Sequence, residues 1–379
     1  MLDKLIDTKE YFNKIRLEQN VVCYGAGSKG IQSLHLLREM DIEPQYFIDS
    51  NKSKWGTKVE GIEVIGYEKL KELTSQYCIL LTCVYTNACE IELFLREQGE
   101  KNPIIFFANP FKAEEKLLSI EEVKNNKLNL EKSYKYLSDE KSKNIMLDFL
   151  NWKMTGNQSY TYRYTEGDWK EFFYDDILPK SKKYTYVDIG AYTGDSIIRF
   201  LAFAEGFYDK IIAFEPDKSN FNAMRDSFDK LRLNNLKIEY INKGLWSCNT
   251  ELSFYSAPDN KIYESSNFFA DTDRLIMSGR KIDGMQHEEK VNVNTLDSYK
   301  INADKLLIKI DALASEAEIL FGGGQIIKEQ HPILIFEFGT HSKHIFDLIP
   351  FIYHLDNSYK FYLRQLSTFN NSRTILYVL

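Results

Sequence analysis

The chain has 379 residues, which is long for one domain and sufficient for two. Its 44% hydrophobic and 27% charged residues are typical of a globular protein, and the net charge of −7 argues against a general nucleic-acid binder. The N-terminal residues are acidic where a secretory signal is basic, and no apolar run is long enough to span a membrane. We therefore expect a cytoplasmic protein that binds no nucleic acid.

Five cysteines occur without a Cys-x-x-Cys pair, which gives no support for a structural zinc. Their odd number without a secretion signal predicts reduced thiols. Cys23, Cys78 and Cys83 lie in strand-like apolar runs, so we interpret them as core residues.

Residues 1–110 alternate strand-like apolar runs with helical periodicity. This alternation predicts a Rossmann-like domain with a parallel sheet. The expected elements are a helix over 7–19, a strand over 21–24, a helix over 31–40, a strand over 45–48, and buried strand-like runs over 77–84 and 103–107.

Residues 111–183 lack a strong strand signal and carry Leu and Ile at helical spacing, over 114–126 and 131–152. We expect a helical connector here rather than a disordered linker.

Residues 184–379 return to alternating strands and helices. Helices are expected over 197–204 and 219–231, and the polar segment 256–289 is expected to cover the site. The expected strands are 184–189, 211–214, 237–241, 306–310, 333–336, 360–363 and 374–378, the last two forming a hairpin. The fold class is thus α/β, with two Rossmann-like doubly wound sheets joined by a helical connector, the second sheet being seven-stranded.

A glycine-containing loop directly follows the strand 184–189. Gly190 and Gly194 allow a tight turn and a close approach of the backbone to a ligand. Asp195 or Ser196 is placed to cap the next helix. Such a loop also occurs as a turn without a ligand, so its function depends on its partners.

Glu215 is the partner that indicates a nucleoside site. It ends the next strand, 21 residues after Gly194, where an acidic side chain accepts hydrogen bonds from both ribose hydroxyls. The spacing alone suits NAD equally well. However, Asp188 precedes the first glycine and the loop reads Gly-x-x-x-Gly-Asp, which suits a cationic methionine moiety better than a pyrophosphate.

Several motifs in this part of the chain, taken together, resemble the FkbM family of class I methyltransferases. They occur in the family's order at residues 187–195, 213–217, 242–247, 296–297, 307–311 and 332–337. The resemblance implies a class I methyltransferase fold over 184–379. It also implies S-adenosylmethionine-dependent O-methylation of a sugar, nucleotide-sugar or polysaccharide-related acceptor.

The same resemblance assigns the cofactor contacts. Asp188, Gly190 and Asp195 would face the methionine portion, Glu215 would bind the ribose, and the loop 242–245 would lie near the adenine. The expected cofactor-binding residues are Asp188, Gly190, Ala191, Tyr192, Gly194, Asp195, Ser196, Glu215, Pro216, Asn242, Gly244 and Leu245.

On the acceptor side, Asp311 and Glu337 end two late strands, and His341 follows four residues later. Reactive groups gather at the carboxyl ends of strands in such sheets, so we expect these three to position or deprotonate the acceptor. The alternatives are a helix N-cap for Asp311 and a surface loop for His341. The three could also converge on a metal, but no metal-ligand spacing is present and we expect none.

The stretch after Asp311 departs from the family pattern. The family carries Glu-Gly where this chain has Leu313-Ala314, followed by Ser315 and Glu316. Either the acceptor differs or the activity is weakened. A binding protein without turnover is therefore an alternative function.

The N-terminal unit has its own glycine loop. Gly25, Gly27, Ser28 and Gly30 follow a strand and open a helix, and Asp49 ends the next strand. Residues 20–70 resemble the N-terminal sugar-nucleotide-binding domains of bacterial sugar acetyltransferases, which implies a nucleotide or nucleotide-sugar site. The alternatives are a module for packing or homodimer formation, and an NAD- or nucleotide-sugar-dependent enzyme centred here.

Overall fold

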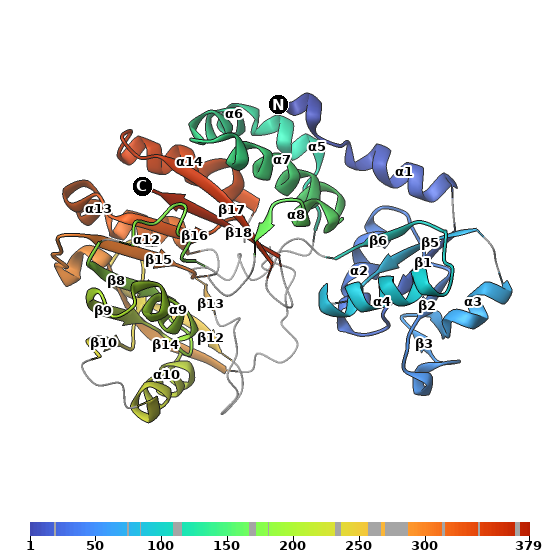
Figure 1. Cartoon of the computed structure of the whole chain (residues 1–379), viewed down its shortest axis with the longest axis horizontal. Helices are drawn as coiled ribbons and strands as arrows, with labels where there is room; N and C mark the ends of the chain where they lie inside the picture. The colour runs from blue at the N-terminus through green and yellow to red at the C-terminus, as the bar shows by residue number, and fades with distance from the viewer. Residues whose placement is uncertain are drawn as a thin grey trace. The chain divides into compact units, whose positions relative to one another are not determined.

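The computed structural model describes most of the chain in two compact units (Figure 1). The described residues are 1–18, 20–73, 76–83, 85–108, 116–166, 172–180, 182–231, 236–256, 267–269, 287–312, 315–339, 342–367 and 372–379. The N-terminal unit comprises 1–131, 140–166 and 365–373, and the C-terminal unit comprises 132–139, 167–364 and 374–379. No helix in the described ranges has the length and apolarity that a membrane crossing requires.

The first sheet is parallel apart from one edge strand, as the alternating pattern predicted. Its order is β3-β4-β2-β1-β5-β6, with only β3 antiparallel. The strands are β1 (Asn20–Tyr24), β2 (Tyr46–Ile48), β3 (Lys58–Val59), β4 (Ile62–Ile65), β5 (Tyr77–Leu81) and β6 (Ile104–Phe106). The sequence did not predict β3 and β4, which are short.

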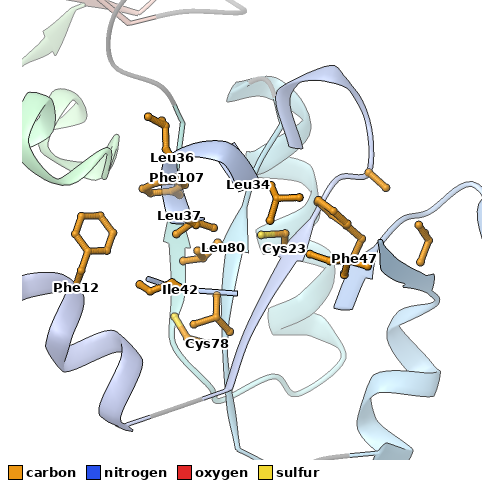
Figure 2. Packing of buried hydrophobic residues seen from close by; sticks show 14 of the residues in the cluster. Phe12, Cys23, Leu34, Leu36, Leu37, Ile42, Phe47, Cys78, Leu80 and Phe107 are labelled. Carbon is orange, nitrogen blue, oxygen red and sulfur yellow. The ribbon is translucent and has the colours of Figure 1, made fainter. Parts of the chain in front are cut away.

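Helices cover both faces of this sheet, so each strand is apolar throughout. Val21 and Cys23 pack on α1 (Thr8–Glu18) and α2 (Ser28–Glu39), whereas Val22 and Tyr24 pack on α3 (Tyr67–Leu73) and α4 (Tyr85–Glu97). Figure 2 shows the first cluster, gathered between α2 and the strands. Cys23 and Cys78 belong to this core, as expected, while Cys83 is only half-buried. Short 3-10 turns lie at Leu2–Lys4 and Lys52–Lys54.

The stretch expected to be a helical connector is largely helical over 120–162, whereas 165–166 forms strand β7 and the described residues 172–180 contain no helix. It contains α5 (Ile120–Asn125), α6 (Lys127–Tyr136), α7 (Glu140–Thr155) and α8 (Ser159–Tyr162). Ser119 and Glu122 form a reciprocal capping box that fixes the start of α5. The helix α7 contacts α1 within the N-terminal unit.

The second sheet has the expected seven strands and one more. Its order is β10-β9-β8-β15-β16-β18-β17-β7, in which β18 is antiparallel to β16 and lies beside β17. The strands are β7 (Thr165–Glu166), β8 (Tyr184–Ile189), β9 (Tyr208–Phe214), β10 (Ile238–Ile241), β15 (Leu306–Ile310), β16 (Ile333–Glu337), β17 (Phe361–Ser367) and β18 (Ser372–Val378). The predicted doubly wound α/β class is therefore confirmed.

Among the described residues, five helices flank the strands of this second sheet (Figure 1). They are α9 (Asp195–Ala204), α10 (Lys218–Leu231), α12 (Glu316–Gly322), α13 (Gly324–Gln330) and α14 (Ser342–Leu355), and a 3-10 turn spans Leu296–Tyr299. Aromatic rings fill the space between α9 and the sheet: Tyr186 of β8 stacks on Phe200 with ring centroids 4.3 Å apart, and Phe173 packs on both.

A small four-stranded sheet, which the sequence did not predict, follows β10. It has the order β11-β14-β12-β13, from β11 (Gly244–Leu245), β12 (Thr250–Ser256), β13 (Asn267–Phe269) and β14 (His287–Asn294). The polar segment expected to cover the site is described only at 256, 267–269 and 287–289, where it forms strand, so its role stays a prediction.

A buried carboxylate ties together three elements of the N-terminal unit. Glu100 accepts hydrogen bonds from the hydroxyls of Tyr67, at 2.7 Å, and Tyr77, at 2.5 Å. The amide of Asn102 donates to its other oxygen at 2.7 Å. Because these donors outweigh burial, the pKa of Glu100 lies below its usual value, and the side chain is held as a charged acceptor.

We expect Tyr77→Phe to lower the free energy of unfolding by about 1.5–3 kcal/mol, because it removes a buried hydrogen bond to a charged group. Urea denaturation followed by circular dichroism measures the change. Tyr46→Phe on β2 is the matched control, since the Tyr46 hydroxyl has no recorded hydrogen bond to a described residue. Equal effects of the two substitutions would contradict the role of Glu100.

Candidate functional site

Five predicted site residues form one row across the carboxyl ends of adjacent strands. The last paired residues of β10, β9, β8, β15 and β16 are in register through Ile241, Phe214, Ile189, Ile310 and Phe336. The next residue on each strand is therefore a neighbour of the next residue on the adjoining strand. These residues are Asn242, Glu215, Gly190, Asp311 and Glu337.

Backbone hydrogen bonds continue the sheet through this row. The N–H of Glu215 donates to the carbonyl of Ile241, that of Gly190 to Phe214, and that of Asp311 to Ile189, at 3.0–3.1 Å. Residues that are more than a hundred positions apart in the sequence thus meet at one edge because they terminate neighbouring parallel strands.

The glycine loop needs its glycines for both conformation and space. Gly190 has φ +76° and Gly194 has φ +88°, in the left-handed region. A Cβ at Gly190 would collide with the carbonyl oxygen of Asp311, and one at Gly194 with the ring of Phe228. The loop is closed by the N–H of Gly194, which donates to the carbonyl of Ala191 at 2.8 Å.

The start of α9 differs from the expected cap. Gly194 is the N-cap residue and makes no side-chain cap, Asp195 is the first helical residue, and Ser196 is the second. The prediction that Asp195 or Ser196 caps this helix is therefore wrong. Asp195 stays half-exposed at the positive end of the helix, 3.4 Å from Arg199, whereas Ser196 is buried.

Glu215 is buried beneath the loop and holds it. Its Oε2 accepts the N–H of Tyr192 at 2.8 Å, and its Oε1 accepts the N–H of Asp217 at 3.0 Å. Tyr192 adopts φ +49°, which turns this N–H toward the carboxylate. Burial raises the pKa of Glu215 to about 8, although both N–H donors oppose the shift.

Asn242 connects β10 to the same strand end. Its side-chain amide donates to the carbonyls of Glu215, at 2.8 Å, and Pro216, at 3.1 Å. Gly244 and Leu245 are buried in β11 and paired with β14. The predicted adenine loop therefore lies directly beside the predicted ribose carboxylate.

Asp188 lies fully buried below the loop, opposite Lys309 in the register of β8 and β15. Its Oδ1 is 3.0 Å from Nζ of Lys309, and its Oδ2 accepts the hydroxyl of Ser196 at 2.5 Å. Nζ of Lys309 also donates to the carbonyl of Gly190 at 3.0 Å. Burial lowers the pKa of Lys309, but the carboxylates of Asp188, Asp311 and Asp195 outweigh it, so the pKa is raised and Lys309 is charged.

On the acceptor side, Asp311 is half-buried and Glu337 is 5% exposed, at neighbouring positions of the row. Ser315, not Asp311, is the N-cap of α12, so the capping alternative for Asp311 is wrong. His341 and Leu313-Ala314 lie outside the described residues. Within the described part of the chain, no three His, Cys, Asp or Glu side chains gather as metal ligands.

The first glycine loop is held by the residues that predicted it. Ser28 begins α2 with Gly27 as its N-cap, and Gly30 lets the helix pass close to the carbonyl of Gly25. Asp49 accepts the N–H of Ala26 at 3.0 Å and Nζ of Lys54 at 2.7 Å. Burial raises the pKa of Asp49, but Lys54 and the backbone donors lower it further, below its usual value. These contacts give Asp49 a structural role in the loop.

Comparisons with known proteins agree with this geometry. Residues 188–361 match the family model described as the methyltransferase FkbM domain. The term FkbM domain is used for this matched stretch. The fold is shared with a methyltransferase FkbM from Methylobacillus flagellatus KT at 18% identity and TM-score 0.69, covering 99% of this chain and 94% of that one.

Two further solved structures match more weakly. UDP-D-quinovosamine 4-dehydrogenase from Vibrio fischeri is 23% identical over 29% of this chain and 86% of its own, with TM-score 0.19. Fibrillarin from Aeropyrum pernix, with bound S-adenosyl-L-methionine, is 8% identical over 53% and 69%, with TM-score 0.29. Neither supports an argument about this chain. No curated protein matches the sequence.

Sequence reasoning assigned no role to Lys309, which proves central to the FkbM domain. Its ammonium group donates to Asp188 in the strand below the loop and to the carbonyl of Gly190 in the loop itself. It also lies 5.2 Å from the centroid of the Phe172 ring. The signal was present, because a lysine interrupts the otherwise apolar strand Leu306–Ile310. A buried lysine in such a strand requires a buried partner.

We expect Lys309→Met to destabilise the FkbM domain by about 3–5 kcal/mol, because it leaves the Asp188 carboxylate buried without its counter-ion. The double variant Asp188→Asn/Lys309→Met should recover a substantial part of this loss. Urea denaturation measures both, with Lys305→Met at an exposed position before the same strand as the control. A single variant as stable as the wild type would show that the pair does not anchor the loop.

Proposed function

We propose that this protein is an S-adenosylmethionine-dependent O-methyltransferase. Its donor would bind over residues 190–196 and Glu215, and its acceptor would bind beside Asp311 and Glu337. The observation that carries this proposal is the continuous row of site residues across five strand ends, within a methyltransferase FkbM domain.

The chemistry of Glu215 fits a ribose. Each carboxylate oxygen accepts one backbone N–H, and the side chain of Asn220 is a further donor, which still leaves lone-pair capacity for a ribose hydroxyl. The buried position makes such hydrogen bonds strong once the carboxylate is charged. Beside Glu215, the side-chain amide of Asn242 donates a hydrogen bond to the carbonyl of Pro216, and these two residues would border the adenine.

The acidic surroundings fit a cationic donor. S-adenosylmethionine, when bound, supplies an electrophilic methyl group on a positively charged sulfur. Asp195 and Asp311 flank the loop, and Lys309 is already paired with Asp188, so it adds little net positive charge. Asp188 itself is enclosed by Lys309 and Ser196 and would act on the methionine portion through the loop that it anchors.

The acceptor proposed is a hydroxyl of a sugar, a nucleotide-sugar or a polysaccharide-related compound. Asp311 and Glu337 would orient this hydroxyl, with His341 as a third candidate. Asp311→Asn should then retain donor binding and lower turnover.

The departure at Leu313-Ala314 favours a second candidate function, a binding protein without turnover. Transfer of labelled methyl to any hydroxyl acceptor would exclude that alternative.

For the N-terminal loop we propose a nucleotide or nucleotide-sugar site formed by Gly25, Gly27, Ser28, Gly30 and Asp49, within a domain ending near residue 110. Lys54 donates to the carbonyl of Ala26 in this loop and would be placed to contact a phosphate bound there, although its charge is shared with Asp49. A packing or dimerisation module is the alternative, and a thermal-shift screen with UDP-sugars, GDP-sugars and NAD separates the two. A helical connector to residue 183 and a cytoplasmic location also stay predictions.

Glu215→Gln should weaken the binding of S-adenosylmethionine and S-adenosylhomocysteine by about 1–3 kcal/mol, because buried ribose hydroxyls lose a charged acceptor. Isothermal titration calorimetry measures the change. Glu239→Gln, on the exposed face of the adjacent strand β10, is the matched control and should bind normally. Unchanged affinity in the Glu215 variant would place the ribose elsewhere.

Binding of S-adenosylhomocysteine should strengthen as the pH rises to about 8 and then level off. In the ligand-free protein Glu215 has a pKa near 8, and ribose hydroxyls donate best to the ionised form, so binding releases a proton. Titrations at pH 6.5 and 8.5 should differ by roughly 10- to 30-fold in affinity.

The Glu215→Gln variant is the control for this dependence, because it keeps every other titrating group, including those of the ligand. The same steep dependence in that variant would assign the titration to another group. In the ligand-free protein, the contribution of Glu215 to folding stability changes with pH in the opposite direction. Because the folded pKa lies above the usual 4.5, Glu215 increasingly disfavours the folded state as the pH rises from about 4.5 toward 8.

A further inference from the structure

We infer that Glu316 and His344 form a proton-accepting pair on the acceptor side of the FkbM domain. His344 would serve as the general base, and Glu316 would be the residue that positions it. The inference rests on the proposed methyltransferase function and adds to it a role for Glu316 and for His344, neither of which belongs to the row of strand ends.

The fold places both residues behind the carboxyl ends of the two acceptor-side strands. Glu316 is the first residue of α12, the helix that follows β15 and Asp311. His344 lies in the first turn of α14, the helix that follows β16 and Glu337. Because β15 and β16 are adjacent and parallel, the two helices begin at the same edge of the sheet.

Glu316 is an unusual carboxylate. It is 0% exposed, and neither of its oxygens accepts a hydrogen bond within the described part of the chain. Burying a carboxylate is costly unless a partner or a ligand compensates it. Among the described residues, the titratable side chain recorded beside it is His344, whose Nδ1 lies 3.2 Å from Oε2.

This arrangement suits proton transfer. A carboxylate close to Nδ1 electrostatically favours a proton on that nitrogen, which leaves Nε2 as the basic one and stabilises the imidazolium that forms. The His344 side chain is 13% exposed, so part of the ring is accessible while Glu316 is completely enclosed. Positioning and proton acceptance are thus divided between the two residues.

In the transfer step, the acceptor oxygen forms a bond to the methyl carbon, and the proton of the acceptor hydroxyl passes to Nε2 of His344. The electron pair of the breaking carbon–sulfur bond stays on sulfur.

Diethyl pyrocarbonate tests the pair without a known acceptor, because it acylates accessible, unprotonated imidazole nitrogens. Trypsin cleaves after Lys343, so His344 and His354 fall on one peptide, and fragment ions distinguish them. His354, exposed at the other end of α14, is the internal control. We expect His344 to react at least as fast as His354 despite its lower exposure.

Two changes should slow His344 selectively. At pH 8.5, where an imidazole is largely unprotonated with or without a neighbouring carboxylate, Glu316→Gln should lower its rate about 5-fold or more, and Glu316→Asp, which keeps the charge, should recover part of that loss. Saturating S-adenosylhomocysteine should protect His344 at least about 3-fold, because the base lies beside the donor. His354 should be unaffected in every case.

Calorimetry with S-adenosylhomocysteine on the same samples separates this inference from the proposed function. Binding with an unreactive His344, or with a rate that neither Glu316→Gln nor the ligand alters, would overturn the pair and leave the methyltransferase proposal intact. A protein that binds no donor would refute the proposed function, and with it the role of the pair. Circular dichroism confirms that the variants are folded.

Discussion

The ion pair between Asp188 and Lys309 is the interaction on which the donor side depends. It joins β8 and β15 in the centre of the second sheet, and both side chains are almost completely buried. Charges at this depth are tolerated only when their remaining hydrogen-bonding capacity is used. Here the hydroxyl of Ser196 and the carbonyl of Gly190 use it, so the start of α9 and the glycine loop are both fixed by the same pair. The loop is thereby shaped before any ligand arrives.

Much of this site could be predicted from the sequence because parallel strands make distant residues neighbours by a simple rule. Each of Glu215, Asp311 and Glu337 directly follows a recognisable apolar run, and ends of adjacent runs must share an edge. The rule that reactive groups gather at the carboxyl ends of strands in such sheets then sufficed to group them. The limits of β8 and β15 were predicted to the residue, since both are buried on two faces and therefore apolar throughout.

What could not be predicted depends on partners that no local pattern reveals. The sequence showed Lys309 only as one residue of a motif. Its role as the counter-ion of Asp188 becomes visible only in the register of the two strands. Glu316 and His344 meet across two helices, and neither position is distinctive in its own helix. The cap of α9 was misassigned because Ser196, a good capping residue, is engaged by Asp188 instead. The strands β3 and β4 were missed because each is too short to show a period.

The two glycine loops use an acidic residue at the next strand end in different ways. Asp49 is ion-paired with Lys54 and has a lowered pKa, so its charge is already compensated within the protein. Glu215 has backbone donors but no recorded cationic partner among the described residues, and its pKa is raised. A carboxylate that is held in place yet under-compensated gains more from an incoming hydroxyl than one that is already neutralised. The same sequence pattern therefore places an under-compensated carboxylate in the C-terminal unit and an ion-paired one in the N-terminal unit, where the Asp49 carboxylate already holds the loop through the Ala26 N–H and Lys54.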